Sequence, residues 1–179
     1  MKQMKLLLLI MGLALVRGIR VQHGHCKEHN QNLTGAWHTI ALASNDMSKI
    51  RREGVFRMAL HKVTDKNDKI YGEFTIRKNG RCHRLSLTAY KTDKEHQYLS
   101  LYSGANIFYI THIKRNEYFM ITLYNYHKNK KTLMFALYGR NREVREEIKE
   151  NFKELCLNNN LNERDIVYLT HFDRCEELA

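Results

Sequence analysis

The chain has 179 residues, of which 43% are apolar and 27% are charged, and it contains no proline. This length and composition suit one globular domain with a hydrophobic core, and they exclude a disordered chain or a collagen-like repeat. The formal net charge is +11, from 30 Lys and Arg against 19 Asp and Glu, which raises nucleic acid or an anionic surface as a partner.

The first eighteen residues have the layout of a secretory signal peptide. Three basic residues and no acidic one surround the apolar run 6–16, which is too short to span a bilayer. A signal anchor is the alternative. We expect cleavage after Gly18, so that residues 1–18 form the signal peptide and residues 19–179 form one secreted domain. Loss of the three basic residues leaves a net charge of +8.

Secretion changes the interpretation of the cysteines, because disulfides form in the oxidising extracellular compartment. Four cysteines allow three complete pairings. The only N-glycosylation motif, Asn32-Leu33-Thr34, comes just before the first predicted strand. We expect Asn32 to be exposed and to carry a glycan.

Hydrophobic residues recur with a period of two between residues 37 and 138, in short segments separated by polar turns. This pattern is typical of an antiparallel meander in which each strand buries one face. The pattern predicts eight strands, at residues 37–44, 56–61, 71–77, 84–90, 98–102, 107–112, 118–126 and 132–138.

The last two strands are apolar on both faces, which indicates that both faces are covered. A helix after them supplies the outer cover: Asn141 is expected to cap it, and Val144, Ile148, Phe152 and Leu155 form one apolar stripe. We therefore expect an all-β fold, an eight-stranded antiparallel up-and-down barrel with one C-terminal α-helix packed outside.

Several motifs occur in the order and spacing of a known family. Gly35-Ala36-Trp37 opens the segment GAWHTIALAS at 35–44. This segment resembles the lipocalin family, whose first strand carries a Gly-x-Trp motif, and within it the branch of major urinary and odorant-binding proteins. The turn Ile-Lys-Arg at 113–115 departs from the family's Thr-Asp-Tyr. Further matches, in the family's order and spacing, are YSGAN at 102–106, LYGR at 137–140, FKELC at 152–156, DIVYL at 165–169 and Arg174-Cys175.

The resemblance implies how the base of the barrel is closed. Gly35 and Trp37 lie at the start of the first strand, and Arg140 follows the last one. In the family this arginine lies over the tryptophan ring. Such a cation–π contact contributes about 0.5–2 kcal/mol.

The resemblance also implies a disulfide. Cys82 and Cys175 occupy the positions of the family's bridge between the barrel and the C-terminal segment, and Cys156 matches a helix cysteine that stays reduced. Cys26 has no counterpart. It pairs with Cys156, links two chains or remains a free thiol, and the sequence leaves these alternatives open.

The function implied by the resemblance is the binding of a small hydrophobic ligand, such as an odorant or pheromone, in the barrel calyx. Tyr138 matches the family's pocket tyrosine and is expected to orient the ligand by a hydrogen bond. The alternative is that the inward residues only fill the core. The expected lining residues, carried over from relatives, are Phe56, Met58, Leu60, Phe74, Leu87, Tyr102, Phe108, Ile121, Leu123, Met134, Ala136 and Tyr138.

We expect no enzymatic activity and no cofactor. Leu60 stands near the position at which one lipocalin branch carries a catalytic thiol, so this chain lacks that thiol. The sequence also has no Ser–His–Asp spacing and no phosphate-binding loop. Three histidines and Cys26 lie within 23–29, a composition that can bind zinc or copper. We expect this run to be a solvated arm and expect no metal.

The charge of +8 does not follow from apolar ligand binding. The alternative function is a secreted basic interaction protein that binds an anionic cell surface or glycan, with an incidental calyx; a scattered, solvated surface is the other interpretation. We expect a monomer or weak dimer, no nucleic acid partner and no transmembrane segment. The sequence does not decide whether a receptor binds the ligand-loaded protein. The basic residues concerned are Lys49, Arg51, Arg52, Lys128, Lys130 and Lys131.

Overall fold

A computed structural model of the chain describes residues 32–175. The predictions for the signal peptide, for Cys26 and for the histidine-rich run 23–29 lie outside these residues. The described part contains ten strands, which form one antiparallel sheet in the order β1-β3-β4-β5-β6-β7-β8-β9-β2-β10. The strands are β1 (Gly35–Ala36), β2 (His38–Ser44), β3 (Met58–Lys66), β4 (Lys69–Lys78), β5 (Arg81–Lys91), β6 (Gln97–Leu101), β7 (Ala105–Lys114), β8 (Tyr118–His127), β9 (Lys130–Gly139) and β10 (Ile166–Tyr168).

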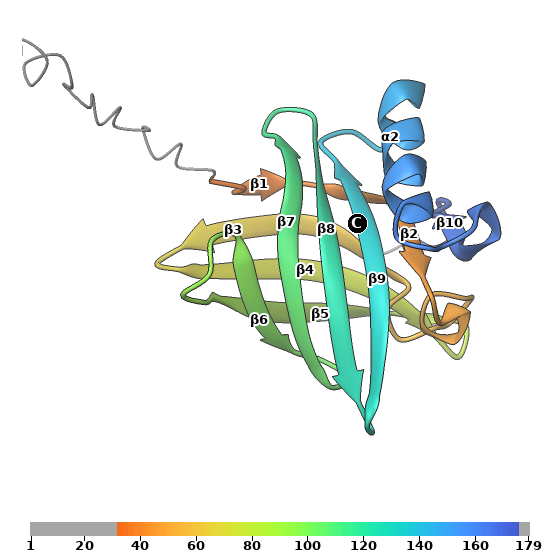
Figure 1. Cartoon of the computed structure of the whole chain (residues 1–179), viewed down its shortest axis with the longest axis horizontal. Helices are drawn as coiled ribbons and strands as arrows, with labels where there is room; N and C mark the ends of the chain where they lie inside the picture. Colours follow the sequence, from red (N-terminus) through yellow and green to blue (C-terminus); the bar gives the residue numbers. More distant parts are fainter. Residues whose placement is uncertain (1–31, 176–179) are drawn as a thin grey trace, which may run out of the picture. The chain divides into compact units, whose positions relative to one another are not determined.

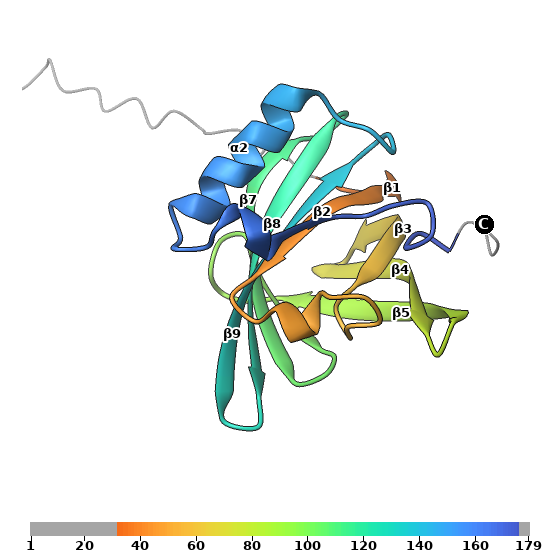
Figure 2. The same cartoon turned by 90° about the vertical axis from the view of Figure 1, so that its right-hand side faces the viewer.

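The sheet curls back on itself, as Figures 1 and 2 show. The segment formed by β1 and β2 joins the two ends of the curled sheet. Gly35 in β1 lies opposite Val63 of β3, whereas β2 pairs with β9. A register shift between Thr39 and Ala41 bends the segment between its two partners, as bulges do. The predicted antiparallel lipocalin-type barrel is therefore confirmed, with its first strand divided in two and β10 added beside it.

Two predicted strands differ slightly at their ends. Phe56 precedes β3 and Tyr102 follows β6, so both lie in connections rather than in strands. Each is nevertheless packed with the barrel core, because a residue next to a strand end continues along the same wall.

The helix α2 (Glu146–Leu157) covers the outer face of β9, β2 and β8 (Figure 2). Its buried residues are Ile148, Phe152 and Cys156, which pack in one hydrophobic cluster with Phe135 and Leu137 of β9. The spacing of four between the buried residues places them on one side of the helix. This second core explains why β9 is apolar on both faces.

The predicted start of the helix was wrong. Arg145 occupies the N-cap position and makes no side-chain cap hydrogen bond, so Asn141 does not cap the helix and Val144 precedes it. Val144 and Leu155 nevertheless pack at the edge of the helix–sheet cluster, and Cys156 adds a third buried residue to the stripe. The helix begins later than predicted because the segment before it is held to the barrel: the Arg140 N–H donates to the Glu117 carbonyl at 2.8 Å, and Arg145 pairs with Glu117 at 2.7 Å.

The connections between strands gather at the two ends of the barrel. We call the end formed by residues 45–57, 79–80, 102–104 and 128–129 the mouth, and the end formed by residues 67–68, 92–96 and 115–117 the base. The long first connection contains the 3-10 helix η1 (Met47–Lys49), and a second one, η2 (Glu163–Asp165), precedes β10.

Candidate functional site

A cavity of about 130 Å³ lies inside the barrel. All of the residues that were predicted to line the calyx contribute to its wall. Alternation along the strands could also have identified Ile70, Ala89 and Ile110, which lie on the same inward faces. Leu33 and Ile50 line the cavity as well, but they lie outside the regular strands, where alternation gives no signal.

The polar groups of the wall are few. The Tyr102 hydroxyl donates to the Val55 carbonyl at 2.8 Å. This hydrogen bond joins Tyr102 to the connection 45–57 at the mouth. The Tyr138 side chain is only 8% exposed, and its burial raises the pKa of the hydroxyl far above the usual value. Within residues 32–175, no protein group forms a hydrogen bond with this hydroxyl. Tyr138 therefore has a neutral donor available inside a largely apolar cavity.

The base of the barrel is closed by the predicted contact between Trp37 and Arg140. The guanidinium carbon lies 3.7 Å from the centroid of the fully buried Trp37 ring, and the same guanidinium donates to the carbonyls of Ala36 and Arg115. Gly35 has a φ of +128°, and a Cβ there would lie 2.6 Å from Arg140 Nη1. Only glycine leaves room for the arginine at this point.

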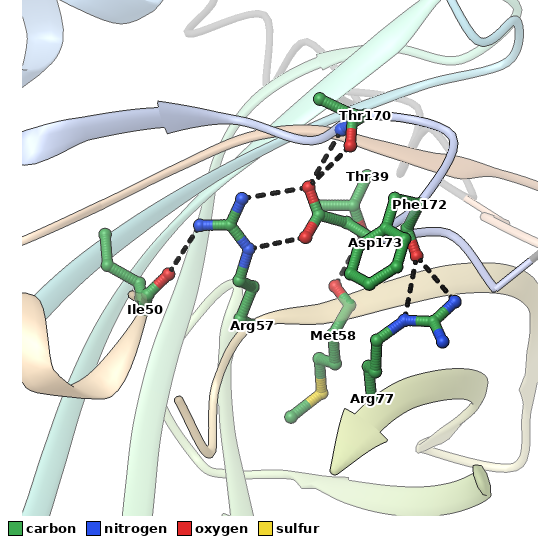
Figure 3. Close-up of polar contacts among 8 residues, drawn as sticks. All are labelled: Thr39, Ile50, Arg57, Met58, Arg77, Thr170, Phe172 and Asp173. Atoms are coloured by element: carbon green, nitrogen blue, oxygen red, sulfur yellow. Dashed lines mark hydrogen bonds and ion pairs between the residues drawn. The ribbon is translucent and has the colours of Figure 1, made fainter. Parts of the chain in front are cut away.

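The mouth is joined to the C-terminal segment by the contacts in Figure 3. Arg57, at the end of the connection 45–57, donates to Asp173 from Nε at 2.7 Å and from Nη2 at 2.9 Å, and its Nη1 donates to the Ile50 carbonyl at 3.1 Å. Thr170 donates to the same carboxylate from its backbone and hydroxyl. Arg77 of β4 donates to the Phe172 carbonyl at 3.3 and 3.1 Å.

The disulfide and the free thiol agree with the resemblance. Cys82 in β5 is bonded to Cys175, which confirms the predicted pair and fixes the same C-terminal segment. Cys156 is free and buried, and burial raises the pKa of its thiol to about 12. At the predicted glycosylation site, the Asn32 side chain accepts a hydrogen bond from the Thr34 N–H at 2.8 Å, and its modification stays a prediction.

Residues 32–175 lack two other kinds of site. This part of the chain has no group of three or more His, Cys, Asp and Glu side chains that could hold a metal ion. It also has no helix with the length and apolar character needed to cross a membrane. Among these residues, the calyx is the apolar cavity that could hold a small molecule.

Comparison with known proteins agrees with this geometry. The model of the Lipocalin / cytosolic fatty-acid binding protein family matches residues 34–173. Trichosurin from Trichosurus vulpecula is 38% identical and is matched over 96% of this chain and 100% of its own. Major urinary protein 1 from Mus musculus is 32% identical, with 95% and 96% covered. The crystal structure of possum trichosurin with bound 4-ethylphenol superposes with a TM-score of 0.73, covering 75% of this chain and 94% of that one. This chain belongs to the lipocalin family, most of whose members are binding and carrier proteins.

Proposed function

We propose that the protein is a secreted carrier that binds a small hydrophobic molecule in its calyx, in the manner of odorant and pheromone carriers. The observation that supports this most is the cavity of about 130 Å³ with a nearly continuous apolar wall. Transfer of an apolar molecule from water to such a wall is favourable in proportion to the area buried. The few polar groups then orient the ligand.

The size of the cavity indicates the size of the ligand. An apolar cavity of roughly 150 Å³ accommodates a benzene molecule, so a small ring or a short aliphatic chain suits the space found here better than a retinoid. The related trichosurin was crystallised with 4-ethylphenol. A phenol of this kind could place its ring against the apolar wall and its hydroxyl near Tyr138.

Secretion is part of the proposal. It is supported by the signal-peptide pattern of residues 1–18 and by the Cys82–Cys175 disulfide, since stable disulfides are typical of oxidising compartments. Mass spectrometry of the protein collected from the medium of expressing cells should show an N-terminus at Ile19 and a glycan on Asn32. Retention of residues 1–18 in a membrane fraction would contradict this part of the proposal.

Ligand binding is tested by displacement of a fluorescent apolar probe, N-phenyl-1-naphthylamine, from the secreted protein. We expect 4-ethylphenol to displace the probe in a saturable way. The affinity should be the same at about 0.05 and 0.5 M NaCl, because salt screens charge interactions and not the burial of a neutral molecule. A well-folded protein that takes up neither probe nor phenol would show that the barrel is filled and would contradict the proposal.

A further inference from the structure

The two ends of the barrel differ in charge. The connections of the mouth contain five basic and two acidic residues, whereas those of the base contain two basic and four acidic ones. Lysines at strand ends occur at both ends and do not distinguish them. The excess positive charge therefore surrounds the mouth, where it raises the local electrostatic potential. The basic residues of the mouth connections are Lys49, Arg51, Arg52, Arg57 and Lys128.

Both acidic residues of the mouth already have partners. Asp46 accepts from Lys130 Nζ at 2.8 Å, and this hydrogen bond, with those from Ser48, lowers the pKa of Asp46 to about 2. Glu53 accepts from the Gly80 N–H at 3.0 Å. Arg57 is neutralised by Asp173 of the C-terminal segment, so the positive charge that remains at the mouth comes from Lys49, Arg51, Arg52 and Lys128.

Lys49 is the basic residue next to the cavity. It is half-buried at the end of η1, and its Nζ lies 5.8 Å from the centroid of the Phe56 ring. Phe56 and Ile50, the residue after Lys49, both line the cavity. No carboxylate of residues 32–175 pairs with Lys49, so the rim carries an uncompensated cation.

The rest of the calyx is unsuited to an anion. The cavity wall contains no charged side chain, and a buried, unpaired charge is costly. At the base, Arg140 is stacked on Trp37 and donates to backbone carbonyls, so it has no free face toward the cavity. A negatively charged group on a ligand is accommodated only at the rim.

We propose that the preferred ligands are small amphiphiles, with an apolar body in the calyx and an anionic headgroup, a carboxylate, sulfate or phosphate, bound by Lys49 at the rim. This rests on the proposed carrier function and specifies its ligand class. Arg51, Arg52 and Lys128 add long-range attraction that favours encounter with an anion. The proposal accounts for the positive charge, which an uncharged odorant does not require.

The test compares 1-octanol with octanoate, which share an apolar chain and differ in the headgroup, by probe displacement at pH 7.4. We expect octanoate to bind at least threefold more tightly at about 0.05 M NaCl and to lose this preference at about 0.5 M. Lys49→Gln should weaken octanoate binding about three- to tenfold and leave octanol unchanged. Lys49→Arg should retain the preference. The matched control is Lys94→Gln, which removes the same charge from the base and should change neither affinity.

The outcomes separate this inference from the proposed function. If octanol, octanoate and 4-ethylphenol all fail to displace the probe, the carrier function itself fails; if 4-ethylphenol binds and both C8 compounds do not, only this inference is wrong. If octanol binds as tightly as octanoate, or if Lys49→Gln and Lys94→Gln act alike, the calyx is a carrier site without headgroup recognition and this inference is wrong. Sedimentation with vesicles of phosphatidylserine that is abolished by Lys49→Gln, with no effect on octanoate, would identify the mouth as a membrane-docking surface and would also overturn it.

Discussion

Arg57 and Asp173, 116 positions apart in the sequence, form two hydrogen bonds of 2.7 and 2.9 Å that connect the mouth of the calyx to the C-terminal segment. Both side chains are largely buried, with 16% and 7% of their surface exposed. Two residues later, Cys175 is bonded to Cys82 of β5. The ion pair thus holds the connection 45–57 to the C-terminal segment, and the disulfide holds that segment to the barrel wall.

Asp173→Asn should lower the free energy of unfolding by about 2–3 kcal/mol, because it leaves the buried Arg57 guanidinium without a counter-charge. Urea unfolding at pH 7 measures the change. The matched control is Glu73→Gln, which breaks a pair with Lys62 whose side chains are more than half exposed and should change the stability by no more than about 0.5 kcal/mol. Equal effects of the two substitutions would contradict the importance assigned to Asp173.

The same ion pair gives a pH dependence with a definite sign. Burial alone would raise the pKa of Asp173, but hydrogen bonds from Arg57 and Thr170 outweigh it and lower the pKa. The stabilisation is therefore present above the pKa of an unfolded aspartate, about 3.9, and is lost as the pH falls through the lower folded-state pKa. The difference in stability between the wild type and Asp173→Asn should shrink below about pH 4. A difference independent of pH would contradict this assignment.

Ala136→Phe should block the calyx while the protein remains folded. Ala136 is 4% exposed and lines the cavity from the middle of β9, so a phenyl group there would occupy the ligand's space, with overpacking costing about 1–3 kcal/mol. Probe displacement should show at least a tenfold loss of 4-ethylphenol binding. Ala136→Ser, which barely changes the volume, should bind as the wild type does. Unchanged binding by a folded Ala136→Phe protein would place the ligand elsewhere.

Cys156 should be unreactive in the native protein. Its thiol is buried between the helix and the sheet, and a pKa of about 12 leaves little thiolate at pH 8. Alkylation by N-ethylmaleimide, followed by peptide mapping to separate it from Cys26, should modify Cys156 only after denaturation. Phe152→Ala, which removes a fully buried neighbour in the same cluster, should destabilise the protein by about 3–5 kcal/mol and accelerate labelling. Rapid labelling of the native wild type would contradict the burial.

The strand faces could be predicted because side chains on a strand alternate strictly. In β9, Ala136 and Tyr138 line the cavity while Leu137 between them packs under α2, and this follows from position alone. The order of the strands and the Trp37 contact followed from the family resemblance rather than from periodicity.

Positions set by tertiary contacts were not predictable. Leu33 lies in the cavity wall and its N–H donates to Asp65 at 3.2 Å, a contact between distant segments that leaves no local pattern. Lys49 and Lys130 were predicted to belong to one basic surface, but Lys130 pairs with Asp46, while Lys49 has no acidic partner among residues 32–175. Only the folded arrangement distinguishes a compensated cation from one available to a ligand.

Tyr138→Phe tests how the ligand is oriented. In the described structure the Tyr138 hydroxyl has no protein partner, so its removal should leave the stability of the free protein within about 1 kcal/mol. With 4-ethylphenol bound, the variant lacks one hydrogen bond, and the affinity should fall about five- to tenfold. Ethylbenzene has no hydroxyl and should bind both proteins equally. Tyr102→Phe is the control, because it breaks the bond to the Val55 carbonyl at the mouth and should weaken both ligands alike. A parallel loss of ethylbenzene binding in Tyr138→Phe would show that Tyr138 shapes the cavity and does not hold the ligand by its hydroxyl.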